Sequence, residues 1–189
     1  MTDPAQERPL TEAEYLELEK TAEVRHEFDS GVLWAMSGGQ WEHNEIVFNI
    51  KTALRGQVYP KGCKVATENI KVWAGKGYFY PDVMLTCEEV ARKTDTFYAP
   101  CAIFEVLSPS TEARDRGVKL RAYTTQIPAL EQYFLVSSEE RIVEVFTRAQ
   151  GGIWAFQRFA PDENAGQDIP VRCVEAALTL EHIYLDTGL

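Results

Sequence analysis

One acidic residue lies inside each of the two most apolar strand-like segments of the chain, and this feature constrains the fold most. Residues 78–86 (YFYPDVMLT) contain Asp82, and residues 101–108 (CAIFEVLS) contain Glu105. A near-continuous apolar run is typical of a central strand that is covered on both faces. An ionised carboxylate in such a strand is costly unless another group compensates its charge. The two acids therefore predict a shared cation, or else separate caps of strand ends or pairs with Arg or Lys.

Helical patterns precede and follow these segments. In residues 11–20, Thr11 and Glu14 have the spacing of a capping box. Residues 41–57 carry apolar side chains at helical spacing, so that one face of this helix is apolar. A third helix is expected over residues 114–126, where the following proline stops it.

Further strand-like segments complete the pattern. Short apolar segments on both sides of Asp29-Ser30-Gly31 indicate a hairpin. Other strands are expected at 63–68, 69–73, 132–138, 141–148 and 153–159, and the last three should be antiparallel. A glycine turn is expected at 151–152 and a loop at 161–168. The remaining tail should form one short strand and one short helix. These elements predict an α/β fold in a single domain over residues 1–189, with residues 1–10 as a flexible N-terminal segment.

Charge and composition limit the partners and the compartment. The net charge of −10 argues against a protein coated with non-specific phosphate contacts, although Arg and Lys are concentrated at 114–121. The N-terminus lacks a signal-peptide pattern and no run of about 18 apolar residues occurs, so we expect a cytoplasmic protein without membrane contact. Free, mostly buried thiols, which fit a reducing compartment, are expected for all four cysteines: Cys63, Cys87, Cys101 and Cys173.

The third helix offers partners for the two buried acids. Asp115, Lys119 and Tyr123 are spaced i, i+4 and i+8, so they share one stripe of that helix. The chain folds back after the Glu105 strand, which could bring this stripe to Asp82 and Glu105. A few carboxylate oxygens suit Mg²⁺, and a nearby Lys could orient a metal-bound water. On spacing alone, an exposed Asp115–Lys119 ion pair is an equal alternative.

Two candidates lie earlier in the chain. Glu27 comes directly before the hairpin turn, and His43 shares the apolar face of the second helix. By residue pattern alone, Glu27 reads as an ordinary strand acid and His43 as a hydrogen-bonded core residue.

Several segments, taken in order, resemble the bacterial Uma family, which is grouped with the PD-(D/E)xK restriction-endonuclease-like superfamily. They are HEFDSGVLWAMSGG (26–39), EHNEIVFNI (42–50), FYPDVML (79–85) and IFEVLSPSTEARDRGVKLRAYTTQIPALEQYFLV (103–136). The resemblance extends from about residue 11 to the end of the chain. It implies a central mixed β-sheet flanked by helices, with an N-terminal helix and hairpin.

The resemblance also implies roles for the candidate residues. Asp82, Glu105 and the Val106 carbonyl would bind Mg²⁺ or Mn²⁺. The superfamily lysine follows the second acid by two residues, a position held here by Leu107, and its role would pass to Lys119. Additional catalytic groups would be Glu27 and His43, with Asp115 and Tyr123 as supporting residues.

The implied function is a metal-dependent endonuclease that hydrolyses phosphodiester bonds in nucleic acid, with DNA as the expected substrate. One alternative is a non-catalytic nucleic-acid- or protein-binding module that keeps the nuclease fold. Another is a hydrolase that acts on a small phosphoester. A homodimer is also expected, because the strand at 141–148 would offer an exposed sheet edge.

Overall fold

The computed structural model describes residues 8–36, 38–163 and 166–189. Most of the N-terminal segment expected to be flexible (1–7) and two positions of the expected loop (164–165) lie outside these residues. The single-domain organisation stays a prediction. Within the described ranges, the strands form three sheets.

The largest sheet is mixed and has six strands. In spatial order they are β11 (Trp154–Phe159), β10 (Val143–Arg148), β9 (Gln132–Ser137), β8 (Ala102–Leu107), β6 (Val83–Thr86) and β3 (Lys64–Thr67). Strands β8 and β9 are parallel, and every other neighbouring pair in this sheet is antiparallel. The parallel pair requires a crossover, which the third helical segment provides.

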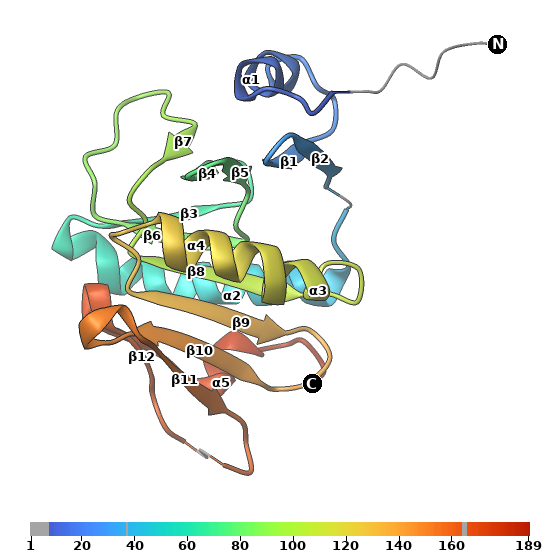
Figure 1. Cartoon of the computed structure of the whole chain (residues 1–189). Coiled ribbons are helices and arrows are strands. Elements are labelled where there is room, and N and C mark those ends of the chain that lie inside the picture. The colour runs from blue at the N-terminus through green and yellow to red at the C-terminus, as the bar shows by residue number, and fades with distance from the viewer. Residues whose placement is uncertain (1–7, 37, 164–165) are drawn as a thin grey trace.

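A second sheet has five strands, and its strands alternate along the chain with β3 and β6 of the large sheet (Figure 1). It consists of β2 (Val32–Ala35), β1 (His26–Asp29), β5 (Gly77–Phe79), β4 (Lys71–Ala74) and β7 (Thr96–Phe97). The expected hairpin is β1–β2, with both turn residues, Ser30 and Gly31, at positive φ. Near the C-terminus, β12 (Ile169–Val171) and β13 (Ala176–Leu178) form a two-stranded sheet.

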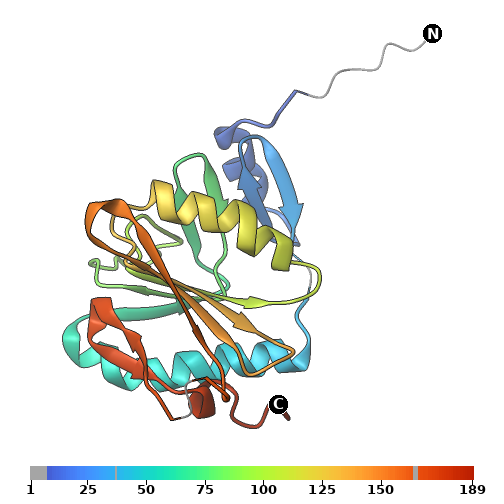
Figure 2. The same ribbon diagram turned by 60° about the horizontal axis from the view of Figure 1, so that its bottom comes forward.

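Helices cover both faces of the large sheet (Figures 1 and 2). Helix α2 (Trp41–Val58) packs with Phe104 and Val106 of β8 in one buried cluster. On the opposite face, Ile103 and Leu107 pack with helix α4 (Leu120–Gln126). Since side chains alternate along a strand, Glu105 belongs to the α4 face.

The other helices are short. Helix α1 (Glu12–Glu19) begins with the expected capping box of Thr11 and Glu14, and α5 (Leu180–Ile183) lies near the C-terminus. Three 3₁₀ segments add single turns: η1 (Tyr59–Lys61), η3 (Gln150–Gly152) and η4 (Arg172–Val174). None of the described helices is long and apolar enough to cross a membrane.

The helix expected over 114–126 is composite. It consists of α3 (Glu112–Arg114), a π-helical turn η2 (Asp115–Lys119) and α4. A π turn carries more residues per turn than an α-helix and is frequent at functional sites. Two members of the expected stripe, Asp115 and Lys119, are the first and last residues of this turn.

The segment 78–86 differs from the single strand-like run that its composition suggested. Its first half belongs to β5 of the second sheet and its second half to β6 of the large sheet. Pro81 and Asp82 form the link between them. Asp82 therefore lies where the two sheets meet, which apolar composition alone could not reveal.

Two further expectations were wrong. The cysteines are not free thiols: Cys63 is bonded to Cys87 and Cys101 to Cys173, with Cα–Cα distances of 4.1 and 6.0 Å. Folding joins residues that are 24 and 72 positions apart. Free thiols therefore no longer support a reducing compartment.

The strand at 141–148 is not an exposed edge. Strand β10 lies between β9 and β11, so the edges of the large sheet are β11 and β3. A dimer formed through β10 is therefore not supported.

Candidate functional site

Asp82 connects the sheet junction to the central strand. Its Oδ2 accepts a hydrogen bond of 2.6 Å from the backbone N–H of Val106, the residue after Glu105. The backbone N–H of Asp82 in turn lies 3.5 Å from Glu105 Oε2. These two contacts hold the Pro81-Asp82 link against β8, with the Asp82 side chain 14% exposed.

Lys119 is the central cation of the buried cluster. Its Nζ lies 3.0 Å from Asp115 Oδ1, 3.1 Å from Glu27 Oε1 and 3.2 Å from Glu105 Oε1. The side chain is 8% exposed, so these ion pairs are largely shielded from solvent. The Asp115–Lys119 pair expected from the spacing is thus formed, but in the interior and not on the surface.

Tyr123 completes the stripe of the third helix. Its hydroxyl donates a 3.0 Å hydrogen bond to Glu105 Oε1, the same oxygen that faces Lys119. Glu105 Oε1 is therefore held by two donors, while Oε2 lies on the Asp82 side. The structure brings together residues 82, 105, 115, 119 and 123, which is one of the two arrangements that the spacing allowed.

Glu27 reaches this cluster from the second sheet. It lies on β1, is buried, and accepts a hydrogen bond of 3.1 Å from the backbone N–H of Tyr80. Its two carboxylate oxygens pair with Lys119 and with Arg114. The Arg114 guanidinium stacks over Trp34 of the hairpin at 4.0 Å. Glu27 is thus more than an ordinary strand acid, because it ties the hairpin to the third helix.

His43 belongs to a neighbouring group on the other side of Asp82. Its Nε2 lies 3.3 Å from Asp82 Oδ2, and its Nδ1 is buried without a hydrogen bond. Glu68, which follows β3, joins these two residues: one potential ligand atom from each of the three lies within 4.8 Å of the others. Sequence reasoning missed Glu68, because it follows a short and unremarkable strand.

Negative charge exceeds positive charge in the combined cluster. Five carboxylates contribute, namely Glu27, Glu68, Asp82, Glu105 and Asp115, against the permanent cations Arg114 and Lys119. Burial raises the pKa of Glu105 well above its usual value, although Lys119 opposes this. Burial also raises the pKa of Asp115. The interior therefore resists full ionisation of its acids.

The two basic titratable groups respond to these acids. Burial acts to lower the pKa of Lys119, but Glu105, Glu27 and Asp115 raise it well above the usual value, so the amine keeps its proton. Burial likewise acts to lower the pKa of His43, and the hydrogen bond and charge of Asp82 raise it.

The residues present suit a divalent cation. Carboxylate and imidazole groups are suitable donors, and the cluster holds more negative charge than its own cations balance. The Glu105 Oε2 on the Asp82 side adds a donor atom. The backbone N–H of Val106 donates a hydrogen bond to Asp82. Cation binding by the Val106 carbonyl stays a prediction.

We expect Glu105→Gln to stabilise the metal-free protein. The folded pKa of Glu105 is raised, so the wild type loses stability as pH rises from the ordinary glutamate pKa towards the folded one, and Gln avoids this loss. A gain of about 1 kcal/mol raises Tm by roughly 2–4 °C at neutral pH. The gain vanishes well below the ordinary glutamate pKa of about 4.3, where the acid is protonated in both states.

Thermal unfolding with a chelator present measures this effect. Glu23→Gln, at an exposed position, serves as the control. A lower Tm for Glu105→Gln at neutral pH would show that the Glu105–Lys119 attraction outweighs the burial of the charge.

Most of the basic residues at 114–121 form ion pairs within the chain. Arg114 and Lys119 pair with Glu27, and Arg116 pairs with Glu112 and Glu144. Arg121 is exposed. Three of the four cations of this segment are therefore in ion pairs.

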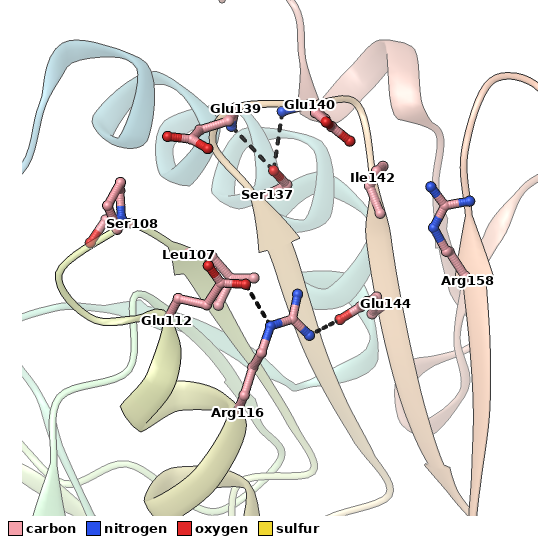
Figure 3. Close-up of a pocket in the computed structure, with 11 residues that line it drawn as sticks. Leu107, Ser108, Glu112, Arg116, Ser137, Glu139, Glu140, Ile142, Glu144 and Arg158 are labelled. Atoms are coloured by element: carbon pink, nitrogen blue, oxygen red, sulfur yellow. Dashed lines mark hydrogen bonds and ion pairs between the residues drawn. The ribbon is translucent and has the colours of Figure 1, made fainter.

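A separate pocket lies at the C-terminal ends of β8 and β9 (Figure 3). Arg116 bridges Glu112 and Glu144 on one side of it, and the Ser137 hydroxyl accepts the backbone N–H groups of Glu139 and Glu140. None of the candidate site residues discussed above lines this pocket.

A mixed sheet with helices on both faces, joined to a second sheet by an acid–lysine cluster, defines a mixed α/β protein. The crystal structure of a "putative nuclease" from Anabaena variabilis has this fold, with a TM-score of 0.76. The match covers 93% of this chain and 98% of that chain at 20% sequence identity. The expected fold class is confirmed.

The chain belongs to the Uma2 family, described as "Putative restriction endonuclease", whose model matches residues 12–181. Two uncharacterised proteins of Synechocystis are similar to it. One is 31% identical over 178 residues, which is 93% of this chain and 91% of that protein. The other is 31% identical over 150 residues, which is 77% of this chain and 84% of that protein. The family resemblance inferred from the sequence is confirmed.

Proposed function

We propose that this protein is a metal-dependent endonuclease that hydrolyses phosphodiester bonds in DNA. The observation that carries this proposal is the convergence of Asp82, Glu105 and Lys119, which come from a sheet junction, a central strand and a π turn. Family membership supports a nucleic-acid substrate. Cytoplasmic location and homodimer formation remain parts of the proposal without a structural argument.

Asp82 and Glu105, with the Val106 carbonyl, would hold Mg²⁺ or Mn²⁺. When bound, the cation lowers the pKa of a coordinated water and offsets negative charge on the phosphoryl group. Asp82 is oriented for ligand binding by the Val106 N–H, and Tyr123 fixes the Glu105 carboxylate.

Lys119 supplies the positive charge that the chain itself directs at the reacting phosphate. Its amine stays protonated, so it acts as a hydrogen-bond donor that orients water and stabilises developing negative charge. Glu27 and Asp115 position this amine from two sides. His43 stands next to Asp82, where its imidazole can exchange a proton or bind a cation.

The location of Lys119 favours this function over the non-catalytic alternative. An amine directed to solvent would suit a binding module, whereas this one contacts Glu105 in the interior. A binding module has no need for such a buried charge cluster, which costs stability.

Cleavage of plasmid and single-stranded DNA tests the proposal. We expect cleavage with Mg²⁺ or Mn²⁺, loss of cleavage on chelation, and recovery when the cation is restored. DNA binding without cleavage under every cation condition would support the binding module. Hydrolysis of a small phosphoester but not of either DNA would support the alternative hydrolase.

A further inference from the structure

His43, Glu68 and Asp82 form a compact donor set outside the Lys119 cluster. Their potential ligand atoms lie within 4.8 Å of one another, and all three side chains are partly accessible. Glu105 and Lys119 of the neighbouring cluster are buried more deeply. Asp82 is thus shared: on one side it faces the interior acids, and on the other it faces an imidazole and a second carboxylate.

The backbone presents Glu68 to this donor set. Glu68 has a φ of +24°, a conformation that is uncommon for a residue with a side chain. Its N–H donates to the carbonyl of Pro81, the residue before Asp82, at 3.1 Å. The turn after β3 and the link that carries Asp82 are therefore fastened together, and such local strain clusters at ligand sites.

His43 is presented by the first turn of α2. Its Nε2 is directed at Asp82, while Nδ1 is buried without a hydrogen bond. A satisfied core histidine, which was the ordinary reading of this residue, would use both ring nitrogens or be surrounded by apolar groups. Here the ring instead approaches two carboxylates.

The donor types indicate the kind of ion. Mg²⁺ prefers oxygen ligands and keeps several waters, whereas imidazole suits first-row transition ions such as Zn²⁺ and Fe²⁺. Mn²⁺ is the weakest binder of that series and is therefore the strictest test ion for the preference. A site of one imidazole and two carboxylates therefore discriminates between the two classes of cation. The pair Asp82 and Glu105 offers only oxygen ligands and discriminates less strongly.

We propose that His43, Glu68 and Asp82 form a cation site of their own, adjacent to the Asp82–Glu105 pair, that takes a first-row transition ion in preference to Mg²⁺. Mn²⁺ serves as the test ion for this preference. The inference deepens the proposed function by giving the metal preference of the same region. It needs Asp82 as a ligand but does not require DNA cleavage.

Binding of Mn²⁺ and Mg²⁺ to the Glu105→Gln variant tests this site. The substitution weakens the inner pair and leaves His43, Glu68 and Asp82 intact. Calorimetry should show one Mn²⁺ site with at least about tenfold tighter binding than Mg²⁺. Pulsed electron paramagnetic resonance of the bound Mn²⁺ should show a nitrogen hyperfine coupling from the imidazole.

Two double variants, each combining Glu105→Gln with one further substitution, identify the ligands. His43→Gln should abolish the nitrogen coupling and bring the Mn²⁺ and Mg²⁺ affinities close together. Glu68→Gln should weaken Mn²⁺ binding at least about tenfold and keep the coupling at high Mn²⁺ concentration. Glu42→Gln, an exposed acid on the same turn of α2, is the control and should change neither.

The outcomes separate this inference from the proposed function. No Mn²⁺ binding by Glu105→Gln, no nitrogen coupling, or equal affinity for the two ions would overturn the His43 site, whether or not the wild type cleaves DNA. Specific Mn²⁺ binding at this site in a protein that cleaves no substrate would uphold the inference and defeat the nuclease proposal.

Discussion

Replacement of Lys119 by Met should lower the free energy of unfolding by about 3–5 kcal/mol, since removal of one partner of a buried ion pair leaves uncompensated charge. Three carboxylates, from Glu27, Glu105 and Asp115, lie within 3.2 Å of the Lys119 amine. Met retains the length of the side chain, so the loss comes mainly from charge and not from a cavity. For a chain of this size the expected decrease in Tm is on the order of 10 °C.

The destabilisation should depend on pH. Without the ammonium group, the folded pKa values of Glu105 and Asp115 rise further, and protonation of these acids relieves the repulsion in the cluster. When the pKa of a group is higher in the folded state than in the unfolded state, the protein loses stability as pH rises from the unfolded pKa to the folded pKa. The deficit of Lys119→Met should therefore be larger at pH 8 than at pH 5.

Thermal and denaturant unfolding at both pH values measure this prediction. Lys76→Met, at an exposed turn position, is the matched control and should change stability little. The double variant Lys119→Met, Glu105→Gln should be more stable than Lys119→Met alone, because one of the unpaired acids is gone. A Lys119→Met protein as stable as the control would mean that the carboxylates do not depend on the amine.

The second large effect is expected on activity. Asp82→Asn should reduce the rate of DNA cleavage by a factor on the order of 10²–10³ or more, because a metal ion supplies several kcal/mol of stabilisation to the reaction. The amide keeps an oxygen that can accept the Val106 N–H, so the link against β8 should survive. Loss of the ligand charge is thereby separated from loss of structure.

Cleavage rates at saturating Mg²⁺ and Mn²⁺, together with Tm, check this prediction. Asp162→Asn removes an exposed acid far from β6 in sequence and serves as the control. If Asp82→Asn retained activity within about tenfold of wild type, the reaction would take place elsewhere or without this ligand.

Local patterns predicted many of the elements well. The capping box at Thr11, the hairpin turn at Ser30 and the apolar strand around Glu105 each depend on neighbouring residues, and each formed as expected. The convergence of Lys119 with Glu105 was one of two arrangements that the helical spacing allowed, and the folded chain decides between them.

Features that depend on long-range packing could not be predicted in this way. Nothing near Glu68 distinguishes it from other acids, and only the turn after β3 brings it to Asp82. The division of residues 78–86 between two sheets depends on pairing with distant strands. Both disulfides, likewise, are set by tertiary structure and not by cysteine spacing.

The charge cluster depends on the number of residues in α4, the α-helix that follows the π turn at Asp115–Lys119. Each residue of an α-helix advances by about 100° around the axis. Deleting Ala122 would turn everything downstream by that amount, so Tyr123 could no longer face Glu105 together with Lys119. Chain length within α4 is therefore as much a determinant of the charge cluster as the identities of its acids.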